Sequence, residues 1–240
     1  MNSLYAIILA GGRGERLGSE EPKQFLDLAG MPVLAWSMEA FAAAGGLAGM
    51  VLVGPDGRLA RMESIAAAHG RGLVRAVVPG GATRQGSSWN GLMALPFDGD
   101  DIVLIHDAAR PFITPATILE CVGAARVHGA AAVYVRATDT VAEGADGFVR
   151  AIPSRECLYY AQTPQCFRYA LIRGAHERAR AEGIDSSTDD VRLALDAGHR
   201  VRIVSGDAGN MKITTAFDLE AARFYAERGI GNDGRRDYRS

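Results

Sequence analysis

The stretch that decides the fold lies at the start of the chain, where Tyr5-Ala-Ile-Ile-Leu9 runs directly into Ala10-Gly-Gly-Arg-Gly-Glu-Arg-Leu-Gly18. An uninterrupted apolar run that ends in glycine is typical of a strand buried on both faces of a parallel sheet. Glycines at such a strand end allow backbone N–H groups to approach an anion closely. The stretch therefore predicts an α/β fold with an anion-binding loop after its first strand.

Two familiar phosphate-binding motifs do not fit this loop. A P-loop requires Gly-Lys-Ser/Thr at the end of its glycine run, which is absent here. The dinucleotide fingerprint requires a glycine at the position of Leu17, whereas Gly18 comes one residue late. What remains is a glycine-rich loop with Arg13, Arg16 and Lys23 at spacings that can surround a polyphosphate. The alternative is an ordinary surface loop whose exposed cations do not bind a phosphate.

Short apolar runs and amphipathic stretches alternate along the rest of the chain. Strands are predicted at 50–53, 74–78, 102–105, 130–135 and 201–204, and helices at 32–43, 59–68, 83–95, 115–127, 168–181, 189–197 and 216–227. Strand–helix–strand repetition at this spacing predicts a mostly parallel sheet with helices on both faces.

The segment 136–162 breaks this alternation. Its runs at 138–141 and 148–152 are short, β-like and separated by glycines, which predicts a hairpin. The hairpin has mixed faces and would be marginally stable alone. We therefore expect a protruding β-arm that packs on a second copy of the chain; a hairpin packed on its own sheet is the alternative. Residues 1–228 are expected to form a single domain with 136–162 as its dimerisation arm, and 229–240 a disordered tail.

Composition excludes several classes of protein. The 240 residues carry 26 Lys+Arg against 28 Asp+Glu, a net charge of -2, so no global field would gather nucleic acid or anionic lipid. No apolar run reaches the ~20 residues of a membrane span, and the first one is too short for a signal-peptide core. The three cysteines lack C-x-x-C spacing, which favours a reducing compartment. We expect a cytoplasmic enzyme or binding domain without nucleic-acid or membrane partners.

Two further groups of residues follow predicted strands. His106-Asp-Ala-Ala-Arg-Pro111 is expected to share a crevice with the glycine loop, since ligands of open α/β sheets bind beyond the carboxyl ends of the strands. Asp107 suits Mg²⁺ or a substrate hydroxyl, and Arg110 a phosphate; a capping or turn aspartate is the alternative. His106 is interpreted as a packed loop histidine without a role. Pro79-Gly-Gly-Ala-Thr-Arg-Gln-Gly-Ser87 suits a turn whose backbone reads a base edge, or a generic strand-to-helix turn.

Together these motifs resemble those of the 2-C-methyl-D-erythritol 4-phosphate cytidylyltransferase family, in the same order and over about 5–226. The most specific are the 10–18 loop with Pro22-Lys-Gln24, the 106–111 stretch, Thr163-Pro-Gln165 and Asn210-Met-Lys212. The resemblance implies a Rossmann-like core with a dimerising β-arm, a homodimer, CTP and a sugar-alcohol phosphate as substrates, and Mg²⁺ or another divalent cation.

Site residues follow from the resemblance by position. It implies that the catalytic cations are Arg16, Lys23 and Lys212. It implies nucleotide binding by Ala10, Gly11, Gly12, Gly14, Gly81 and Ser87. It implies substrate binding by Asp107, Arg110, Thr140, Thr188 and, from the partner's arm, Arg155, with Asp107 also the expected metal ligand. In the implied reaction the substrate phosphate attacks the α-phosphorus of CTP in line and expels pyrophosphate. A phosphate monoester is largely dianionic at pH 7, so this attack needs no general base.

Departures from the family pattern leave alternatives open. Many relatives have Ala-Ala-Gly in place of Ala10-Gly-Gly12 and an acidic residue in place of Gly86. Ala-Gly-Gly, the 163–166 stretch and Lys212-Ile-Thr-Thr215 also resemble pentitol-phosphate cytidylyltransferases, which make CDP-ribitol, whereas Asp107-Ala-Ala-Arg110 favours methylerythritol phosphate. More distant alternatives are a molybdenum-cofactor guanylyltransferase, a sugar-1-phosphate nucleotidyltransferase and a non-catalytic nucleotide-binding regulator. Some relatives are fused to the cyclodiphosphate synthase of the same pathway; we expect no second enzyme in these 240 residues.

Overall fold

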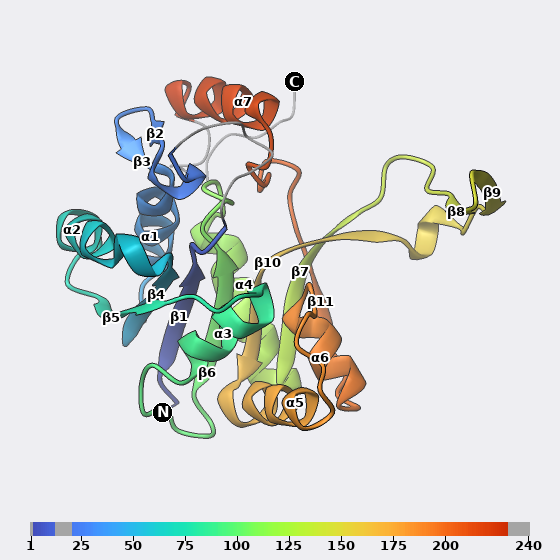
Figure 1. The fold of residues 1–240 in the computed structure, drawn as a ribbon, viewed down its shortest axis with the longest axis horizontal. Coiled ribbons are helices and arrows are strands. Elements are labelled where there is room, and N and C mark those ends of the chain that lie inside the picture. Colours follow the sequence, from blue (N-terminus) through green and yellow to red (C-terminus); the bar gives the residue numbers. More distant parts are fainter. Residues whose placement is uncertain (1, 13–20, 230–240) are drawn as a thin grey trace.

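The computed structural model describes residues 2–12 and 21–229. One central sheet contains, in spatial order, β11 (Arg202–Ser205), β7 (Ala130–Arg136), β10 (Tyr159–Arg168), β6 (Ile102–Asp107), β1 (Leu4–Leu9), β4 (Gly49–Gly54) and β5 (Val74–Pro79) (Figure 1). Neighbouring strands pair in parallel except β10, which runs antiparallel to both β6 and β7. The prediction of a mostly parallel α/β sheet is confirmed.

Helices cover both faces of this sheet (Figure 1). The core on one face contains side chains of α1 (Val33–Ala44), α2 (Leu59–His69) and α4 (Pro115–His128). The core on the other face contains side chains of α3 (Arg84–Leu92), α5 (Tyr169–Ala181) and α6 (Asp190–Asp196). Alternation along β1 feeds both cores, because Ile8 belongs to the first and Ile7 to the second, each 0% exposed. The apolar run that opens the chain is therefore buried on both faces, as predicted.

A smaller apolar cluster lies at the end of the molecule toward which the carboxyl ends of the parallel strands point (Figure 1). It joins α7 (Ala216–Glu227) to the short hairpin of β2 (Asp27–Leu28) and β3 (Met31–Pro32). Trp36 and Phe112 meet edge to face in this cluster, with ring centroids 5.7 Å apart. Helix α7 begins at a capping box formed by Thr215 and Asp218. The cluster includes Ile213 and, packed against it, Met211, so it fixes the chain on either side of Lys212.

Strand β10 is the largest departure from the sequence-based expectation, which had assigned 159–162 to the arm and no strand to 163–167. Its centre contains Pro164, with a cis peptide bond after Thr163, and the buried polar residues Gln162 and Gln165. Proline is rare in central strands, and buried polar residues remove the apolar signal of a strand. The register against β7 shifts between Ala161 and Gln165, which accommodates the interruption.

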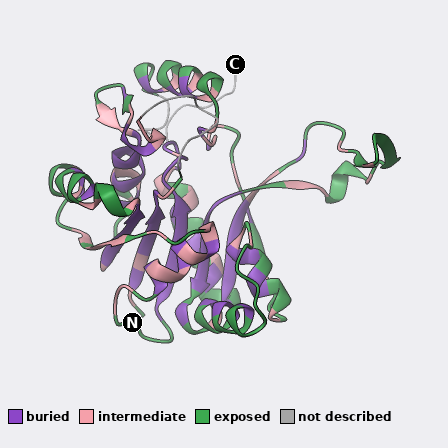
Figure 2. Cartoon of the chain, in the orientation of Figure 1, coloured by how far each residue is buried: buried purple, intermediate pink, exposed green. Residues whose placement is uncertain are grey.

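Residues 137–158 leave the central sheet between β7 and β10; we call this segment the arm. It carries a separate hairpin of β8 (Glu143–Ala145) and β9 (Phe148–Ala151). Figure 1 shows the arm extending away from the rest of the chain, and Figure 2 shows most of it exposed. The expected strand at 138–141 is wrong: pairing starts later because the Asp146-Gly147 turn, with φ of 55° and 82°, sets the register. Packing of the arm on a second copy stays a prediction.

Three further expectations concern the C-terminal tail, membrane-spanning helices and the number of domains. The expected disordered tail lies outside them from residue 230 onward. Within the ranges 2–12 and 21–229, none of the helices combines the length and apolar content that crossing a bilayer requires. The expectation of a single domain over 1–228 stays a prediction.

Candidate active site

The candidate site lies where loops following several parallel strands meet at the carboxyl edge of the sheet, which is where ligands of open α/β sheets bind. Loop 107–111 follows β6, loop 10–12 follows β1, turn 80–87 follows β5, and loop 210–214 reaches them from the last part of the chain. Backbone hydrogen bonds join these segments: Ala108 N donates to Leu9 O at 2.9 Å, Ala10 N to Val53 O at 2.6 Å, Gly80 N to Gly54 O at 2.7 Å, and Ile213 N to Ala109 O at 2.8 Å. The described parts of these loops therefore lie together at one edge of the sheet; that they line one crevice stays a prediction.

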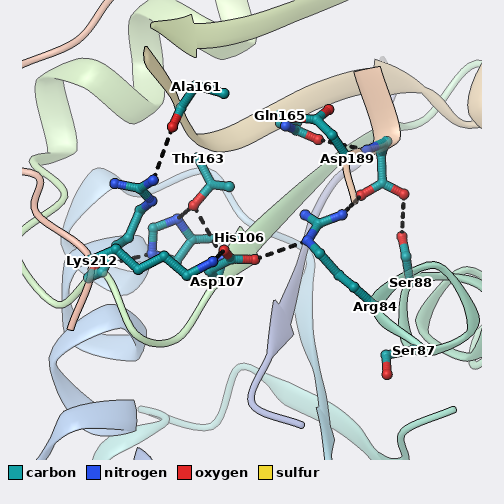
Figure 3. Close-up of polar contacts among 12 residues, drawn as sticks. Arg84, Ser87, Ser88, His106, Asp107, Ala161, Thr163, Gln165, Asp189 and Lys212 are labelled. Atoms are coloured by element: carbon teal, nitrogen blue, oxygen red, sulfur yellow. Dashed lines mark hydrogen bonds and ion pairs between the residues drawn. The ribbon is translucent and has the colours of Figure 1, made fainter. Parts of the chain in front are cut away.

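Asp107, the last residue of β6, is a buried carboxylate between two cations (Figure 3). Lys212 Nζ lies 2.6 Å from Oδ2, and Arg84 Nε lies 3.3 Å from Oδ1. Burial acts to raise the pKa of Asp107, but the charges of Arg84 and Lys212 and the hydrogen bond from Lys212 outweigh it and hold this pKa well below its usual range. Asp107 is therefore a permanently ionised group that fixes the position of both cations.

Arg84 extends this charge network to a second buried carboxylate. Its Nη1 atom lies 2.6 Å from Oδ2 of Asp190, the first residue of α6. The other oxygen of Asp190 accepts from Ser88 Oγ at 2.7 Å and contacts His176 Nε2 at 2.8 Å. Burial opposes ionisation of Asp190, but the charge of Arg84 and the bond with His176 lower its pKa to about 2. Arg84 thus joins α3, β6 and α6 through one guanidinium.

His106 holds the loop that follows it. Its Nε2 atom lies 3.1 Å from Arg110 O, which can only accept, so Nε2 carries the proton. Nδ1 then accepts from the Thr163 hydroxyl at 2.9 Å, and the same hydroxyl accepts from Asp107 N at 3.1 Å (Figure 3). Burial lowers the pKa of His106 to about 4, so the ring is neutral at pH 7. Because both ring nitrogens are engaged, His106 positions the loop and is not placed to accept a proton from substrate.

Arg110 forms no ion pair with a carboxylate among the described residues, although the charge of nearby Asp107 acts on it. Nη1 donates to Asn210 O at 2.7 Å and Nη2 to Ala161 O at 3.0 Å, both neutral carbonyls. Its buried Nε atom and the buried Oδ1 of Asn210 have no hydrogen-bond partner among the described residues. Burial is the main reason that the pKa of Arg110 falls below its usual value. A guanidinium held by carbonyls is suited to an incoming phosphate dianion.

Lys23 joins the loop after β1 to the loop that carries Lys212. It begins a short 3₁₀ turn, η2 (Lys23–Phe25), which the buried ring of Phe25 anchors in the core. Its Nζ atom donates to Ile213 O at 2.8 Å, and an ideal Cβ on Gly12 would lie 3.6 Å from Lys23 Cε. The side chain therefore passes beside Gly12 of the glycine loop. Two of the three predicted catalytic cations, Lys23 and Lys212, meet at the 210–214 loop.

The predicted nucleotide-binding residues Gly11, Gly81 and Ser87 also come together. Ser87 Oγ accepts from Gly81 N at 3.1 Å, and an ideal Cβ on Gly11 would lie 3.5 Å from that oxygen. A Cβ on Gly81 would lie 2.7 Å from the backbone carbon of Gly86, so the turn closes only with glycine at this position. Ala10, buried at the end of β1, precedes Gly11 in the same region. These contacts form a compact backbone turn at the sheet edge.

The remaining predicted residues lie elsewhere or outside the described residues. Gly14 and Arg16 fall in 13–20, which the structure does not describe. Thr140 and Arg155 lie on the arm, and Arg155 Nη1 donates to Thr138 O at 3.4 Å. Within one chain the structure does not bring these two residues to Asp107. Thr188 is exposed and immediately precedes Asp189, the capping residue of α6.

The sequence analysis missed four residues that build the site: Arg84, Thr163, Gln165 and Asp190. The first three were quoted inside motifs without an assigned role. Asp190 N donates to Gln165 Oε1 at 3.2 Å, so a polar residue of β10 supports the start of α6. Thr163, Gln165 and Asp190 are buried, which a sequence does not show directly. The quoted motifs at 79–87 and 163–165 were the signals that could have pointed to Arg84, Thr163 and Gln165.

The donor set was compared with the requirements of Mg²⁺. In the described part of the chain no group of three or more His, Cys, Asp and Glu side chains is arranged to hold a metal. Proteins commonly bind Mg²⁺ through one or two carboxylates together with substrate phosphates. The one carboxylate at the centre of the site, Asp107, fits this mode when a triphosphate supplies the other oxygens. It does not fit a metal held by protein ligands alone.

Comparisons with known proteins agree with this geometry. The profile of the family described as IspD, 2-C-methyl-D-erythritol 4-phosphate cytidylyltransferase, matches residues 4–228. The chain is 43% identical over 226 residues to the 2-C-methyl-D-erythritol 4-phosphate cytidylyltransferase of Geobacter metallireducens, covering 93% of this chain and 97% of that protein. It is 47% identical over 217 residues to a bifunctional IspD/IspF enzyme of Rhodopseudomonas palustris, covering 89% of this chain and 53%, about half, of that relative.

A solved structure extends the likeness to the fold. The crystal structure of 4-diphosphocytidyl-2C-methyl-D-erythritol synthase from Anaerococcus prevotii is similar with a TM-score of 0.82 and 30% sequence identity, covering 95% of this chain and 99% of that one. The resemblance in the sequence motifs is therefore confirmed over most of the chain. On these grounds the chain belongs to the 2-C-methyl-D-erythritol 4-phosphate cytidylyltransferase family.

Proposed function

We propose that this protein transfers the cytidylyl group of CTP to 2-C-methyl-D-erythritol 4-phosphate, forming 4-diphosphocytidyl-2-C-methyl-D-erythritol and releasing pyrophosphate. The observation that carries the proposal is that three cations meet at the 210–214 loop. Lys212 pairs with Asp107, Lys23 donates to Ile213 O, and Arg110 donates to Asn210 O. Family membership supports CTP and the methylerythritol phosphate as substrates.

The difficulty of this reaction is electrostatic, and the site residues address it. A phosphate oxygen of the acceptor attacks the α-phosphorus of CTP, a new P–O bond forms, and the bond to the β-phosphate breaks with pyrophosphate as the leaving group. The attacking monoester is largely dianionic at pH 7, so no general base is needed. Lys23, Lys212 and Arg16 are proposed to hold the triphosphate, and Arg110 the acceptor, which offsets repulsion between two anions. Mg²⁺ bound to the phosphates and to Asp107 would neutralise further negative charge and help to align the groups.

The nucleotide is proposed to lie against the turns after β1 and β5. Backbone groups at Ala10, Gly11, Gly12, Gly14 and Gly81, with the Ser87 hydroxyl, would contact the base, ribose and phosphates. Gly81 is exposed, and the absence of a side chain there lets this turn close against Gly86. The acceptor is proposed to bind on the other side of Asp107, between Arg110 and Thr188.

A homodimer completes this proposal. Thr140 and Arg155 lie on the arm, which extends away from its own chain (Figure 1), so we assign them to the acceptor site of a partner subunit. Phe148, Val149 and Ile152 are 77%, 68% and 65% exposed on or beside the hairpin. Such a cluster of exposed apolar side chains is typical of an interaction surface. A cytoplasmic location is also proposed, because Cys121, Cys157 and Cys166 are free thiols.

The decisive experiment measures pyrophosphate release with each of four nucleoside triphosphates and each of two acceptors, methylerythritol 4-phosphate and ribitol 5-phosphate, in the presence of Mg²⁺. We expect turnover with CTP and the methylerythritol phosphate. Preference for ribitol 5-phosphate would assign the chain to the pentitol-phosphate reaction. Nucleotide binding without turnover of either acceptor would contradict an enzymatic role.

A further inference from the structure

Residues 184–188 form an exposed connection between α5 and α6, here called the acceptor strap because it ends at Thr188. The strap belongs to no helix or strand. Three hydrogen bonds tie it to the first residues of α3. Gln85 Nε2 donates to Ile184 O at 2.7 Å, Ser187 N donates to Gln85 Oε1 at 2.8 Å, and Thr83 Oγ1 donates to Asp185 O at 2.7 Å. The side-chain amide of Gln85 therefore binds two backbone groups of the strap, Ile184 O and Ser187 N, which lie three residues apart.

Gln85 is suited to this task by its burial and by its chemistry. It is 3% exposed, and both its hydrogen bonds are partly buried. Its donor and acceptor are each matched to a backbone group of opposite kind, and losing either leaves a buried polar atom unsatisfied. The strap residues at 184–186 are themselves exposed and contribute little burial of their own. Ile184 N also donates to Ala179 O at 2.8 Å and Ser187 Oγ to Asp189 O at 2.8 Å, at the two ends of the strap. Between these ends, the contacts to the rest of the molecule come from Gln85 and Thr83.

The far end of the strap leads directly to the acceptor side of the site. Asp189 caps α6 through Val191 N at 2.6 Å, and Asp190 is held by Arg84. Thr188 lies between these anchored residues and the Gln85 contacts, and its hydroxyl has no partner among the described residues. The chain thus presents an unoccupied hydroxyl at a position fixed from both sides.

Thr83, which contacts the strap, is also hydrogen-bonded within the turn proposed to bind the nucleotide. Thr83 O accepts from Ser87 Oγ at 3.0 Å, and Ser87 Oγ accepts from Gly81 N. Thr83 Oγ1 also accepts from Gly86 N at 3.0 Å, which caps α3. The turn at 80–87 and the acceptor strap are consequently joined in one hydrogen-bonded unit through residues 83–87.

We propose that Gln85 is a positioning residue that fixes Thr188 for binding of the sugar-alcohol phosphate and sets its place relative to the nucleotide turn. Gln85 does not touch either substrate; it acts through the backbone of the strap. The inference rests on the proposed function for the identity of the acceptor. It predicts that damage to the Gln85 amide weakens acceptor binding and spares CTP binding.

The test replaces Gln85 by glutamate, because the carboxylate can be switched by pH. At pH 8 an ionised Gln85→Glu side chain keeps the acceptor for Ser187 N but opposes a carboxylate oxygen to Ile184 O. We expect the KM for methylerythritol phosphate to rise about 10- to 100-fold over wild type, with the CTP affinity, measured by calorimetry without acceptor, within about threefold of wild type. Burial favours the neutral acid, whose hydroxyl can donate to Ile184 O. The ratio of variant to wild-type KM should therefore fall toward one as the pH is lowered to 6.

Matched variants separate positioning from general damage. Ser186→Asp adds the same charge to the exposed strap without removing a Gln85 contact, and its KM should stay near that of wild type. Gln85→Met removes both hydrogen bonds without adding charge; it should raise the acceptor KM at both pH values and carries the test if Gln85→Glu does not fold. Hydrogen exchange at Ser187 N, which donates to Gln85, should become faster in Gln85→Met.

Each result decides the inference. An unchanged acceptor KM in a folded Gln85 variant, an equal loss of CTP affinity, or a KM ratio for Gln85→Glu that ignores pH would overturn it. If wild type turns over neither acceptor, the proposed function fails; unchanged hydrogen exchange at Ser187 in Gln85→Met would then overturn the positioning role independently.

Discussion

At the scale of single residues, Asp107 shows how a site for two anions is held together when neither is bound. Arg84 and Lys212 would repel each other across the crevice without the carboxylate between them. Because the pKa of Asp107 lies well below its usual range, this negative charge persists at any physiological pH. Cations arranged before the substrate arrives need little reorganisation during the reaction.

Lys23→Ala and Lys212→Met each remove one cation proposed to act on the triphosphate. We expect kcat to fall by about 10²–10³-fold in each folded variant, the usual cost of losing one such donor. Pyrophosphate release at saturating substrates measures the loss, and circular dichroism checks folding. Arg173→Met, which removes an exposed cation on α5, is the control and should keep wild-type turnover. Near-wild-type turnover in folded Lys23→Ala would overturn its catalytic assignment.

His106→Gln tests the role of a buried neutral imidazole. The pKa of His106 is about 4 in the folded protein, against 6.5 for an ordinary histidine. As the pH falls from 6.5 toward 4, His106 becomes protonated in the unfolded chain but stays neutral in the folded chain. Protonation therefore favours the unfolded chain, and the free energy of unfolding decreases in that pH range. The loss amounts to roughly 3 kcal/mol at most, about 1.4 kcal/mol per pH unit.

Glutamine cannot titrate there, so the unfolding free energy of His106→Gln should fall less between pH 7 and pH 4.5, as measured by urea titration. Asp107 and Asp190 do not contribute in this window, because their pKa values are lowered from an ordinary value that already lies beneath it. His199→Gln, at an exposed position, should retain the wild-type pH dependence. An identical pH dependence in His106→Gln and wild type would contradict a buried neutral ring.

At the scale of elements, the sequence predicted those whose apolar pattern matches their burial. Strand β1 was predicted because its apolar run suits burial on both faces, and the helix predicted at 115–127 is α4, Pro115–His128. Strand β10 was not, because its central residues are polar and are satisfied by partners distant in the chain, such as Asn210 with Thr163 O at 3.0 Å. A local pattern cannot contain such a partner.

The same limit applies to the candidate site. Motifs directly after strands located Asp107, Gly81 and Lys23, since the fold places strand ends together. Arg84 was missed because its partners Asp107 and Asp190 lie 23 and 106 positions away in the chain. Pairing across such separations is a property of the folded sheet and leaves no periodic signal in the sequence.

The arm supplies a test at the scale of an element. Arg155→Ala should raise the KM for the sugar-alcohol phosphate while leaving the affinity for CTP unchanged, because Arg155 is proposed to reach the acceptor phosphate of a partner. Initial rates at varied acceptor and calorimetric titration with CTP provide the two readouts. Arg150→Ala removes another exposed arginine of the same arm and should have little effect on either. An equal loss of CTP affinity in Arg155→Ala would show that the arm assignment is mistaken.

At the scale of the whole molecule, the exposed side chains of the arm predict association. We expect light scattering at micromolar concentration to give the mass of two chains. Phe148→Asp, which places a charge at a 77% exposed apolar position, should shift the mass toward one chain because the charge would have to be desolvated in the interface. Phe217→Asp, a similar change at an exposed position on α7, should leave the mass unchanged. A monomeric wild type would rule out the proposed dimer.

The outward path of the arm has a consequence for mixtures of defective subunits. If each crevice combines its own Lys23 with a neighbour's Arg155, a hybrid of Lys23→Ala and Arg155→Ala chains contains one doubly damaged crevice and one intact crevice. Random exchange of equal amounts would restore about one quarter of all crevices. Two preparations that are each nearly inactive at low acceptor concentration would then regain activity on co-expression. The absence of such complementation would mean that each active site is built from the residues of a single chain.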